Sequence, residues 1–128
     1  MAVGSEEAND ATFDIEKRRL YLCHLMLAER RIITRYLKQN DWNHATLIML
    51  LELYGATKPL SVSSLSYASG VSQPTAGRLT VDLETRRFID RETDPRDARR
   101  THVSMTPRGY ATMRTILDEC GTARNIGR

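Results

Sequence analysis

The 128-residue sequence lacks the features that mark secreted and membrane proteins. Only two cysteines are present, Cys23 and Cys120, and they form no C-x-x-C pair. This pattern fits free thiols in a reducing cytoplasm better than a disulfide framework. The acidic N-terminus has neither the basic start nor the apolar run of a signal peptide, and no apolar run approaches the length of a membrane span. We therefore expect a cytoplasmic protein that does not contact a membrane.

Catalytic and metal-binding patterns are also missing. The three histidines, His24, His44 and His102, are scattered and share no metal-ligand spacing with one another or with the cysteines. The sequence contains no recognisable phosphate-binding loop, carboxylate pair or nucleophile–base–acid arrangement. We therefore expect no metal, no cofactor and no enzymatic activity.

Lysine is absent from one long stretch of the chain. From Arg78 to Arg108 all eight basic residues are arginine. The planar guanidinium presents a fork of donors that suits phosphates and base edges. The formal net charge of +3 is only mildly basic and is weak evidence alone. The identity of the charges is more informative than their sum.

The chain is long enough for a single domain with one core. Residues 1–12 are expected to be mobile, residues 13–121 to form the domain, and residues 122–128 to form a loose tail. From about Asp14 to Gln39 the pattern is helical, and a 25-residue helix is about 37 Å long, more than this domain needs for its own core. Its broad apolar face favours a second chain packed there over a long core helix with frayed ends. The apolar face consists of Ile15, Leu20, Leu22, Cys23, Met26, Leu27, Ile33 and Leu37.

Two further helices are expected, one before and one after the helix-turn-helix and hairpin described below. One runs from His44 to Tyr54, is apolar on nearly all sides and should be the central core helix. Gly55 is expected to end it in the left-handed conformation. Residues 58–60 form a candidate short strand beside a later hairpin. The last helix is expected to begin at Thr106-Pro107 and to end near residues 120–121.

Two short helices joined by a tight turn are expected in the central region. Ser61 should cap the first, which would carry Leu65 and Ala68 on its inner face and break at Gly70. Ser72 should cap the second, at about residues 73–85. This order predicts a helix-turn-helix whose second helix enters a DNA groove.

An arginine-rich hairpin, the wing, is expected at about residues 88–105. It would turn at the polar segment 94–97 and return over residues 99–105. Helix, turn, helix and hairpin together predict a mainly α fold with a small β-hairpin wing, a winged helix-turn-helix. The wing would lie against the DNA backbone beside the groove that holds the recognition helix.

The candidate DNA contacts in the recognition helix lie in its first turns. Gln73 can pair with adenine, Thr75 can touch a thymine methyl, and Arg78 can pair with guanine or a phosphate. Backbone amides beside Ser72 suit a phosphate, and Gly77 removes bulk where the helix would meet the duplex. An ordinary solvated helix start is the alternative. The whole set is Ser72, Gln73, Pro74, Thr75, Gly77 and Arg78.

Arg99 is the wing residue expected to enter the minor groove. Asp97, two positions earlier on the same face of the strand, can hold its guanidinium by a bidentate pair. Narrow A·T-rich grooves attract such an arginine. Arg96 and Arg100 would add phosphate contacts, and the alternative is a solvated hairpin of little value to stability. Three other arginines face either phosphates or solvent: Arg86, Arg87 and Arg91.

Three segments carry a family resemblance, which is clear from about residue 60 to residue 109. They are Leu65 to Thr75, then Asp97-Ala98-Arg99, then Met105-Thr106-Pro107-Arg108-Gly109. These segments resemble the MarR family of bacterial transcription regulators. The resemblance implies a homodimer, joined mainly through the first and last helices, that binds a pseudo-palindromic operator in double-stranded DNA and usually represses nearby genes.

The resemblance also implies regulation. Many members release DNA on binding a small phenolic or aromatic ligand or on oxidation of a cysteine, so a small-molecule effector is a further expected partner. Cys23 lies roughly where peroxide-sensing members carry a cysteine. A sensor thiol needs a lowered pKa and solvent access, and we expect Cys23 instead to be buried and inert.

The sequence departs from the family pattern at three places. Arg87 stands where the family usually has glycine, and a left-handed backbone there would cost about 1 kcal/mol. Ser69 occupies a usually apolar position. The chain ends soon after Gly109, which suggests a short member whose C-terminal helix is truncated or absent.

Two classes of function are compatible with these residues. The first is a dimeric, sequence-specific DNA-binding regulator, with a redox- or ligand-sensing regulator as its refinement. The second is a winged helix used as a protein-interaction module. Arg78 together with Asp97 and Arg99 favours the first, because an interaction module has no need of this set.

Overall fold

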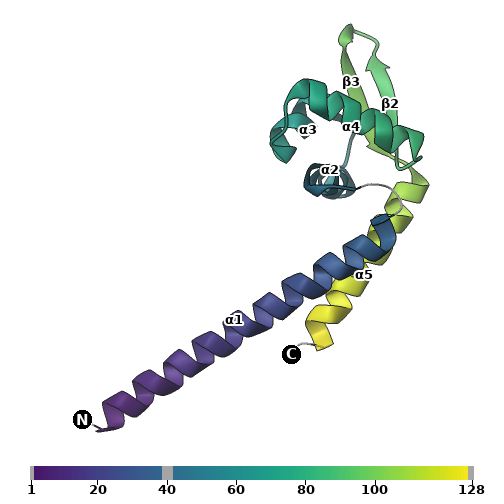
Figure 1. Cartoon of the computed structure of the whole chain (residues 1–128). Coiled ribbons are helices and arrows are strands. Elements are labelled where there is room, and N and C mark those ends of the chain that lie inside the picture. The colour runs from purple at the N-terminus through teal and green to yellow at the C-terminus, as the bar shows by residue number, and fades with distance from the viewer. Residues whose placement is uncertain (1, 39–41, 127–128) are drawn as a thin grey trace.

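A long pair of helices and a winged-helix unit make up the structure, a computed structural model that describes residues 2–38 and 42–126 (Figure 1). The elements, in chain order, are α1 (Ala2–Leu37), α2 (His44–Gly55), β1 (Leu60–Ser61), α3 (Val62–Ser69), α4 (Gln73–Thr85), β2 (Ile89–Asp94), β3 (Asp97–Met105) and α5 (Pro107–Ile126). The mainly α fold with a small β-hairpin wing is confirmed. The core lies where α2 packs against α3, the sheet and α5.

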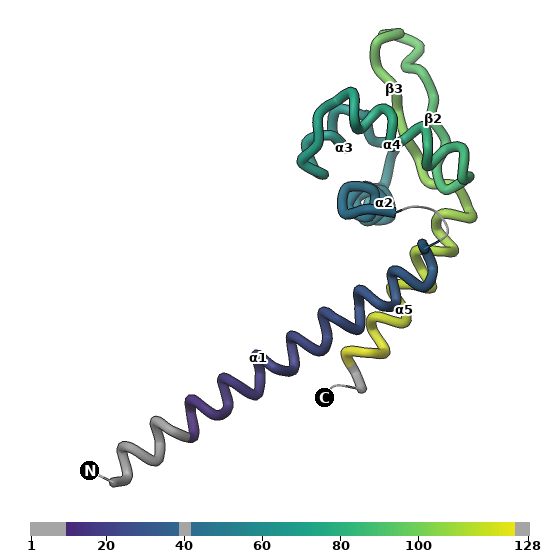
Figure 2. Tube along the Cα trace, viewed as in Figure 1, coloured from purple at the N-terminus to yellow at the C-terminus, as the bar shows by residue number. Residues whose placement is uncertain are grey.

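α1 is longer than its apolar periodicity predicts. It begins at Ala2 instead of about Asp14, and its predicted end at Gln39 lies outside the described residues. Alanine and glutamate, both good helix formers, recur in residues 2–11, and proline is absent there. In Figure 2 the purple part of α1 continues past the end of α5.

α5 continues to Ile126, so the expectation of a truncated or absent C-terminal helix is wrong. It lies along the second half of α1 (Figure 1). The Tyr36 hydroxyl donates to the Glu119 carboxylate, which also pairs with Arg35 at 3.0 Å. The Tyr21 hydroxyl donates to the Arg124 carbonyl oxygen at 3.0 Å. The helix was expected to end near residues 120–121, and the Tyr21–Arg124 contact lies beyond that point, where it holds the last turns against α1. A glycine inside a helix costs only about 1 kcal/mol, which such a contact can offset.

α2 begins as the sequence predicts but ends differently. Asn43 is its N-cap: the Asn43 side chain accepts from the Thr46 amide at 2.9 Å, and the Thr46 hydroxyl oxygen accepts from the Asn43 amide at 2.8 Å. The expected left-handed Gly55 is wrong, because the chain leaves the helix through an extended Ala56, with φ −81° and ψ 141°. The extended backbone at Ala56 leads the chain directly toward β1. A left-handed glycine at residue 55 would have turned the chain in another direction.

The helix-turn-helix follows its predicted caps, with one change of inner face. Ser61 accepts from the Ser64 amide at 3.1 Å, and Gly70 ends α3 in the left-handed conformation at φ 71°. The expected inward Ala68 is exposed, and Ser66 is buried beside Leu65 instead. The Ser66 hydroxyl donates to the Val71 carbonyl oxygen at 2.6 Å. A buried serine is thus stabilised by a bond that also holds the turn before α4.

The wing hairpin, β2 and β3, belongs to a three-stranded antiparallel sheet in the order β1-β3-β2. The candidate strand at residues 58–60 forms at its end, where Leu60 pairs with Val103. β3 begins at Asp97, before the expected start at Arg99, because Asp97 pairs with Asp94 across a two-residue turn. A bulge at Thr93–Asp94 adjusts the register there.

The end of α4, the start of β2 and the start of α5 meet in one tight junction. Arg87, which stands where the family usually has glycine, is left-handed, with φ 66°. The Thr106 hydroxyl lies 2.6 Å from the Arg87 carbonyl oxygen, to which it donates, and it accepts from the Gly109 amide at 3.0 Å. A Cβ at Gly109 would lie 2.2 Å from the Phe88 carbonyl oxygen. The Thr-x-x-Gly motif therefore joins the recognition helix to α5.

Candidate nucleic-acid interface

The recognition helix α4 presents its first turns to solvent. The Ser72 side chain accepts from the Thr75 amide at 3.3 Å, and its hydroxyl also lies 3.0 Å from the Thr75 hydroxyl oxygen. Thr75 is half-buried, and its amide and hydroxyl both interact with Ser72, whereas Gln73 and Arg78 are exposed. The predicted base-reading face is therefore formed mainly by Gln73 and Arg78.

The opposite face of α4 fixes the orientation of the helix. Ala76, Thr80 and Leu83 are buried against the core. The Thr80 hydroxyl donates to the Gly77 carbonyl oxygen at 2.8 Å, so its burial leaves no hydroxyl unbonded. No described atom lies within 4 Å of a Cβ built at Gly77. The space beside Gly77 is therefore open to a partner.

Asp97 and Arg99 pair in the wing, but not in the predicted bidentate geometry. One carboxylate oxygen of Asp97, Oδ1, accepts both the Arg99 amide at 3.0 Å and Arg99 Nε at 3.3 Å. The short two-residue spacing brings the backbone amide to the carboxylate first, and the side chain then reaches it only through Nε. The Arg99 side chain is 93% exposed. Its pairing therefore leaves the outer end of the guanidinium toward solvent.

The tip of the wing is held by a second aspartate. Asp94 Oδ1 accepts from the Arg96 amide at 2.8 Å, and Asp94 Oδ2 lies 3.0 Å from His102 Nε2. The Arg96 amide, followed by His102, lowers the pKa of Asp94. The ionised carboxylate fixes a turn that exposes Arg96 and Arg100 at the end of the wing. These two arginines lie where the sequence led us to expect phosphate contacts.

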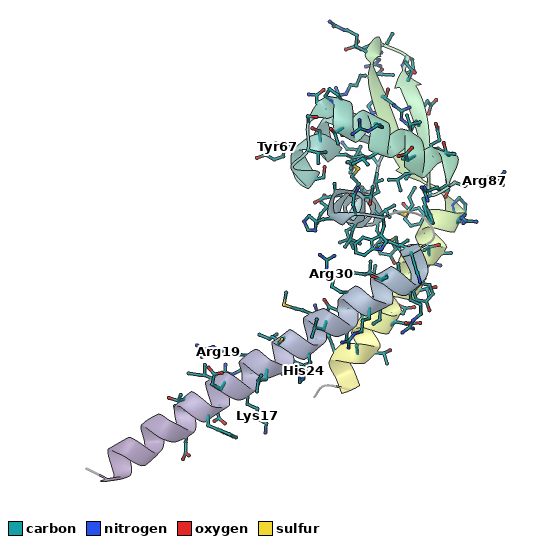
Figure 3. All side chains as sticks on the ribbon, viewed as in Figure 1. Lys17, Arg19, His24, Arg30, Tyr67 and Arg87 are labelled. Atoms are coloured by element: carbon teal, nitrogen blue, oxygen red, sulfur yellow. The ribbon has the colours of Figure 1, made fainter. Side chains whose placement is uncertain are left out.

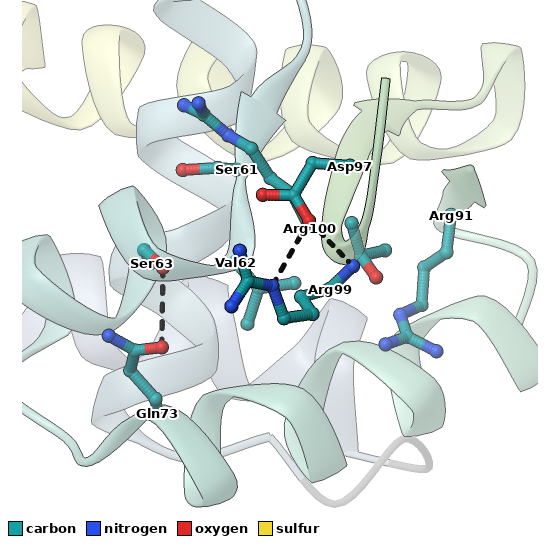
Figure 4. Close-up of a pocket in the computed structure, with 9 residues that line it drawn as sticks. Ser61, Val62, Ser63, Gln73, Arg91, Asp97, Arg99 and Arg100 are labelled. Carbon is teal, nitrogen blue, oxygen red and sulfur yellow. Dashed lines mark hydrogen bonds and ion pairs between the residues drawn. The ribbon is translucent and has the colours of Figure 1, made fainter. Parts of the chain in front are cut away.

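A polar pocket of about 430 Å³ lies between the wing and the starts of α3 and α4 (Figure 4). It brings together four of the predicted residues, Gln73, Asp97, Arg99 and Arg100, but not Arg78 or Arg96. Five other residues line it: Ser61, Val62, Ser63, Arg91 and Thr101. Arg91 was left open between phosphate and solvent, and Ser63 was missed. The Ser63 hydroxyl donates to Gln73 Oε1 at 3.3 Å, a tertiary contact that no sequence motif indicates.

The remaining arginines lie at the other end of α4. Arg87 is exposed there and points away from the molecule (Figure 3). Arg86 is half-buried and forms the C-cap of α4, its amide donating to the Asp82 carbonyl oxygen at 3.0 Å. Neither residue lines the pocket. Of the three arginines whose environment was left open, only Arg91 joins the predicted contacts.

The environments of the two cysteines differ from each other and from the prediction. Cys23 is exposed, so the expectation of a buried core cysteine is wrong: it lies on a side of α1 that α5 does not cover. Cys120 is half-buried, and burial, followed by the nearby Glu29 carboxylate, raises the pKa of its thiol. A raised pKa makes a thiol less nucleophilic at neutral pH.

Comparison with known proteins identifies the winged-helix unit. Residues 43–100 match the MarR family. The unit is a MarR-type winged helix-turn-helix. This family comprises DNA-binding transcription regulators rather than enzymes, in agreement with the prediction from sequence. No curated protein matches the chain.

Several solved structures share the fold over most of this chain. The S. aureus MepR–DNA complex is 24% identical, with a TM-score of 0.65 over 83% of this chain and 90% of that one. MarR itself is 26% identical, with a TM-score of 0.63 over 82% of this chain and 76% of that one. YusO from Bacillus subtilis is 20% identical, with a TM-score of 0.69 over 92% of this chain and 81% of that one. The similarity therefore extends beyond the winged unit to α1 and α5.

Membrane and metal features were also sought in the described residues. Across residues 2–38 and 42–126, no helix combines the length and hydropathy needed to cross a membrane. The same part of the chain contains no group of three or more histidine, cysteine or acidic side chains placed to hold a metal ion.

Proposed function

We propose that the protein is a sequence-specific transcription regulator that binds a pseudo-palindromic operator as a homodimer. α4 enters the major groove, where Gln73 and Arg78 contact base edges, and Arg99 of the wing enters the adjacent minor groove. The observation that carries the proposal is the placement of exposed Gln73, Arg99 and Arg100 around one polar pocket on the same face. A protein-interaction module, the alternative, gives no reason for this concentration of arginine.

The DNA complex of MepR supports a DNA-binding role for this fold. That protein shares the fold of this chain and was solved bound to DNA. Ser72 caps the first turn of α4, where its side chain accepts from the Thr75 amide, and Pro74 follows it. The partial positive charge of this helix N-terminus favours a nearby phosphate. Asp97 holds Nε of Arg99 and leaves its terminal nitrogens available to a narrow groove.

The homodimer is proposed from the exposed apolar surface of α1. Phe13 is 68% exposed and Met26 is 65% exposed. Large apolar side chains exposed in this number on one helix are typical of an interface rather than of a monomer. A second copy packed on α1 and α5 would cover them. The exposed large apolar side chains of α1 are Phe13, Ile15, Leu20, Leu22, Met26 and Leu27.

We further propose that the protein represses transcription and responds to a small effector. A largely apolar pocket of about 400 Å³ lies between α1, α2 and α5, at the junction of the helix pair and the winged unit. Ile33, Leu47, Met113 and Ile116 contribute to its lining. An aromatic ligand of modest size fits this chemistry, and its binding would alter the spacing of the two recognition helices.

DNA recognition is tested by two variants and a control. Arg78→Ala should weaken operator binding by about 1–3 kcal/mol if Arg78 pairs with a base. Arg99→Ala should weaken binding and relax the preference for A·T pairs beside each half-site. Arg114→Ala removes an exposed arginine from α5, away from α4 and the wing, and should leave affinity unchanged. Unchanged affinity for both Arg78→Ala and Arg99→Ala would contradict the proposed roles.

Dimerisation is tested by sedimentation of variants in the exposed apolar surface. Leu20→Glu places a charge in that surface and should shift the mass toward the monomer. Tyr67→Ser removes a large exposed side chain from α3, far from α1 (Figure 3), and should leave the mass unchanged. In the DNA-bound dimer, the two α4 helices should lie about 34–36 Å apart, one turn of the duplex. A wild-type protein that sediments only as a monomer would refute this part of the proposal.

A further inference from the structure

Arg91 has an environment that the proposed function does not explain. It lies on β2, where its backbone amide donates to Glu84 Oε2 of α4 at 3.0 Å. Its side chain is half-buried, and its Nε is buried without a hydrogen-bond partner among the described residues. A buried charged donor that lacks an acceptor is costly. The position is therefore held firmly by the backbone while the guanidinium remains incompletely satisfied.

The surroundings of Arg91 are strongly cationic. Arg91, Arg99 and Arg100 line the same polar pocket, which we call the wing notch, and Asp97 is the one carboxylate among its lining residues. Asp97 Oδ1 is already occupied by Arg99. Figure 4 shows Arg99 between Ser63 on one side and Arg91 on the other. The notch thus offers guanidinium donors and a hydroxyl, with little competing negative charge.

The notch lies between the two elements that are proposed to enter the DNA grooves. It is bounded by the start of α4, which is proposed to enter the major groove, and by the wing, which is proposed to enter the minor groove. A DNA strand that separates these two grooves must pass between the two elements. Val62 and Ser63 are the first residues of α3, and their amides have no acceptor within that helix. These amides and the arginines face the path of the strand.

We propose that the wing notch binds one phosphodiester of the DNA backbone in each half-site, with Arg91 as its principal ligand. This inference rests on the proposed DNA-binding function. A guanidinium can hold two phosphate oxygens at once, and a turn of the Arg91 side chain toward the strand would also give its buried Nε an acceptor. Arg91 then positions the duplex without reading its sequence, whereas Arg99 senses the groove. Ser63 donates to the same phosphate by turning away from Gln73.

Binding measured at several salt concentrations separates these roles. The probe is a duplex that the wild-type protein selects from random sequence. Arg91→Gln should weaken binding to selected and unrelated duplexes by the same factor and reduce the salt slope by about one per half-site. Arg91→Lys should restore most of the slope, because it keeps the charge. Arg114→Gln loses the same charge outside the notch and should retain the wild-type slope.

A neutral phosphate in the DNA tests the contact directly. Methylphosphonate is placed at one backbone position at a time, and each duplex is titrated with wild type and with Arg91→Gln. At one position per half-site the substitution should weaken wild-type binding and have no further effect on Arg91→Gln. Thermal unfolding of each variant shows that it is folded, and Ser63→Ala should give a weaker effect at the same position.

Different failures point to different conclusions. Additive losses at every methylphosphonate position, or an unchanged salt slope in Arg91→Gln, would overturn the phosphate site while leaving DNA recognition intact. Saturation of the notch by inorganic phosphate alone, with DNA binding unaffected by Arg91→Gln, would also overturn it in favour of a site for free phosphate. A wild-type protein that binds no DNA would overturn both this inference and the proposed function.

Discussion

Gly109→Ala should destabilise the protein, although the same change usually stabilises a helix. Gly109 lies in the first turn of α5, where the Phe88 carbonyl oxygen passes close to it. A Cβ would meet that oxygen at 2.2 Å and the Met105 Cγ at 2.6 Å. The oxygen belongs to the backbone and also accepts the Thr106 amide at 3.1 Å, so it cannot move aside freely.

Two opposing contributions set the size of the effect. Alanine is favoured over glycine in a helix interior by about 1 kcal/mol. Forcing one extra carbon into a packed site costs about 1–3 kcal/mol, and contact with rigid backbone belongs at the upper end. We therefore expect a net loss of about 1–2 kcal/mol in the free energy of unfolding, the difference between these two contributions.

Gly121→Ala is the matched control because Gly121 lies in the same helix. No described atom lies within 4 Å of a Cβ built there, so only the helix preference remains. Thermal and urea unfolding at equal protein concentration should show Gly109→Ala less stable than wild type and Gly121→Ala slightly more stable. Equal stabilisation by both substitutions would refute the close-packed junction between β2 and α5.

Three other predictions concern the wing and its base. Arg87 is left-handed, so the Arg87→Gly variant should be more stable than Arg87→Ala by about 1 kcal/mol. At Arg86, where φ is −82°, the Ala variant should be more stable than the Gly variant. Equal differences at the two positions in urea unfolding would show that the left-handed φ does not affect stability. Thr106→Val should cost about 1 kcal/mol in the same assay through loss of the cap on α5, and no loss would mean that the cap is dispensable. The pKa of Asp94 is held below its ordinary value of 3.8, chiefly by the Arg96 amide and then by His102, so its ionised form stabilises the fold above that pH. This contribution is lost as the pH falls through the lowered value. Asp94→Asn should remove that part of the pH dependence of unfolding, and an identical profile would exclude the contribution.

Signals that act within a few residues were predicted well from sequence. Ser61 and Ser72 cap their helices, and Gly70 ends α3, because each choice depends on local hydrogen bonds and backbone conformation. The departure from the family pattern at Arg87 pointed to a position where a left-handed backbone would be strained, and the backbone there is left-handed. At these positions tertiary contacts reinforce what the local sequence prefers.

Features that depend on packing were predicted less well. The extra length of α5 depends on α1, because the Tyr21 hydroxyl donates to the Arg124 carbonyl oxygen and Arg124 pairs with Glu29 across a long sequence separation. Ser66 takes the inner position expected for Ala68 because its hydroxyl finds the Val71 carbonyl oxygen. Helical periodicity cannot distinguish a polar residue with a buried partner from one that faces solvent.

The candidate site shows the same division. The spacing of Asp97 and Arg99 predicted that they pair. That one oxygen, Asp97 Oδ1, accepts both bonds from Arg99 depends on the local backbone conformation of β3. Ser63 and Arg91 join the notch only because α3 and β2 are brought together by the fold. Arg91 Nε is buried without a hydrogen-bond partner among the described residues, and one sequence carries no signal of that burial.

The central claim is that this winged helix binds a specific DNA sequence as a dimer. The most direct test is a titration of the purified protein on promoter and random-sequence DNA at two salt concentrations, with its mass in solution recorded. We predict tight binding to one promoter, a steep loss of affinity with salt and the mass of a dimer. Absent binding, or equal affinity for every sequence, would contradict the claim.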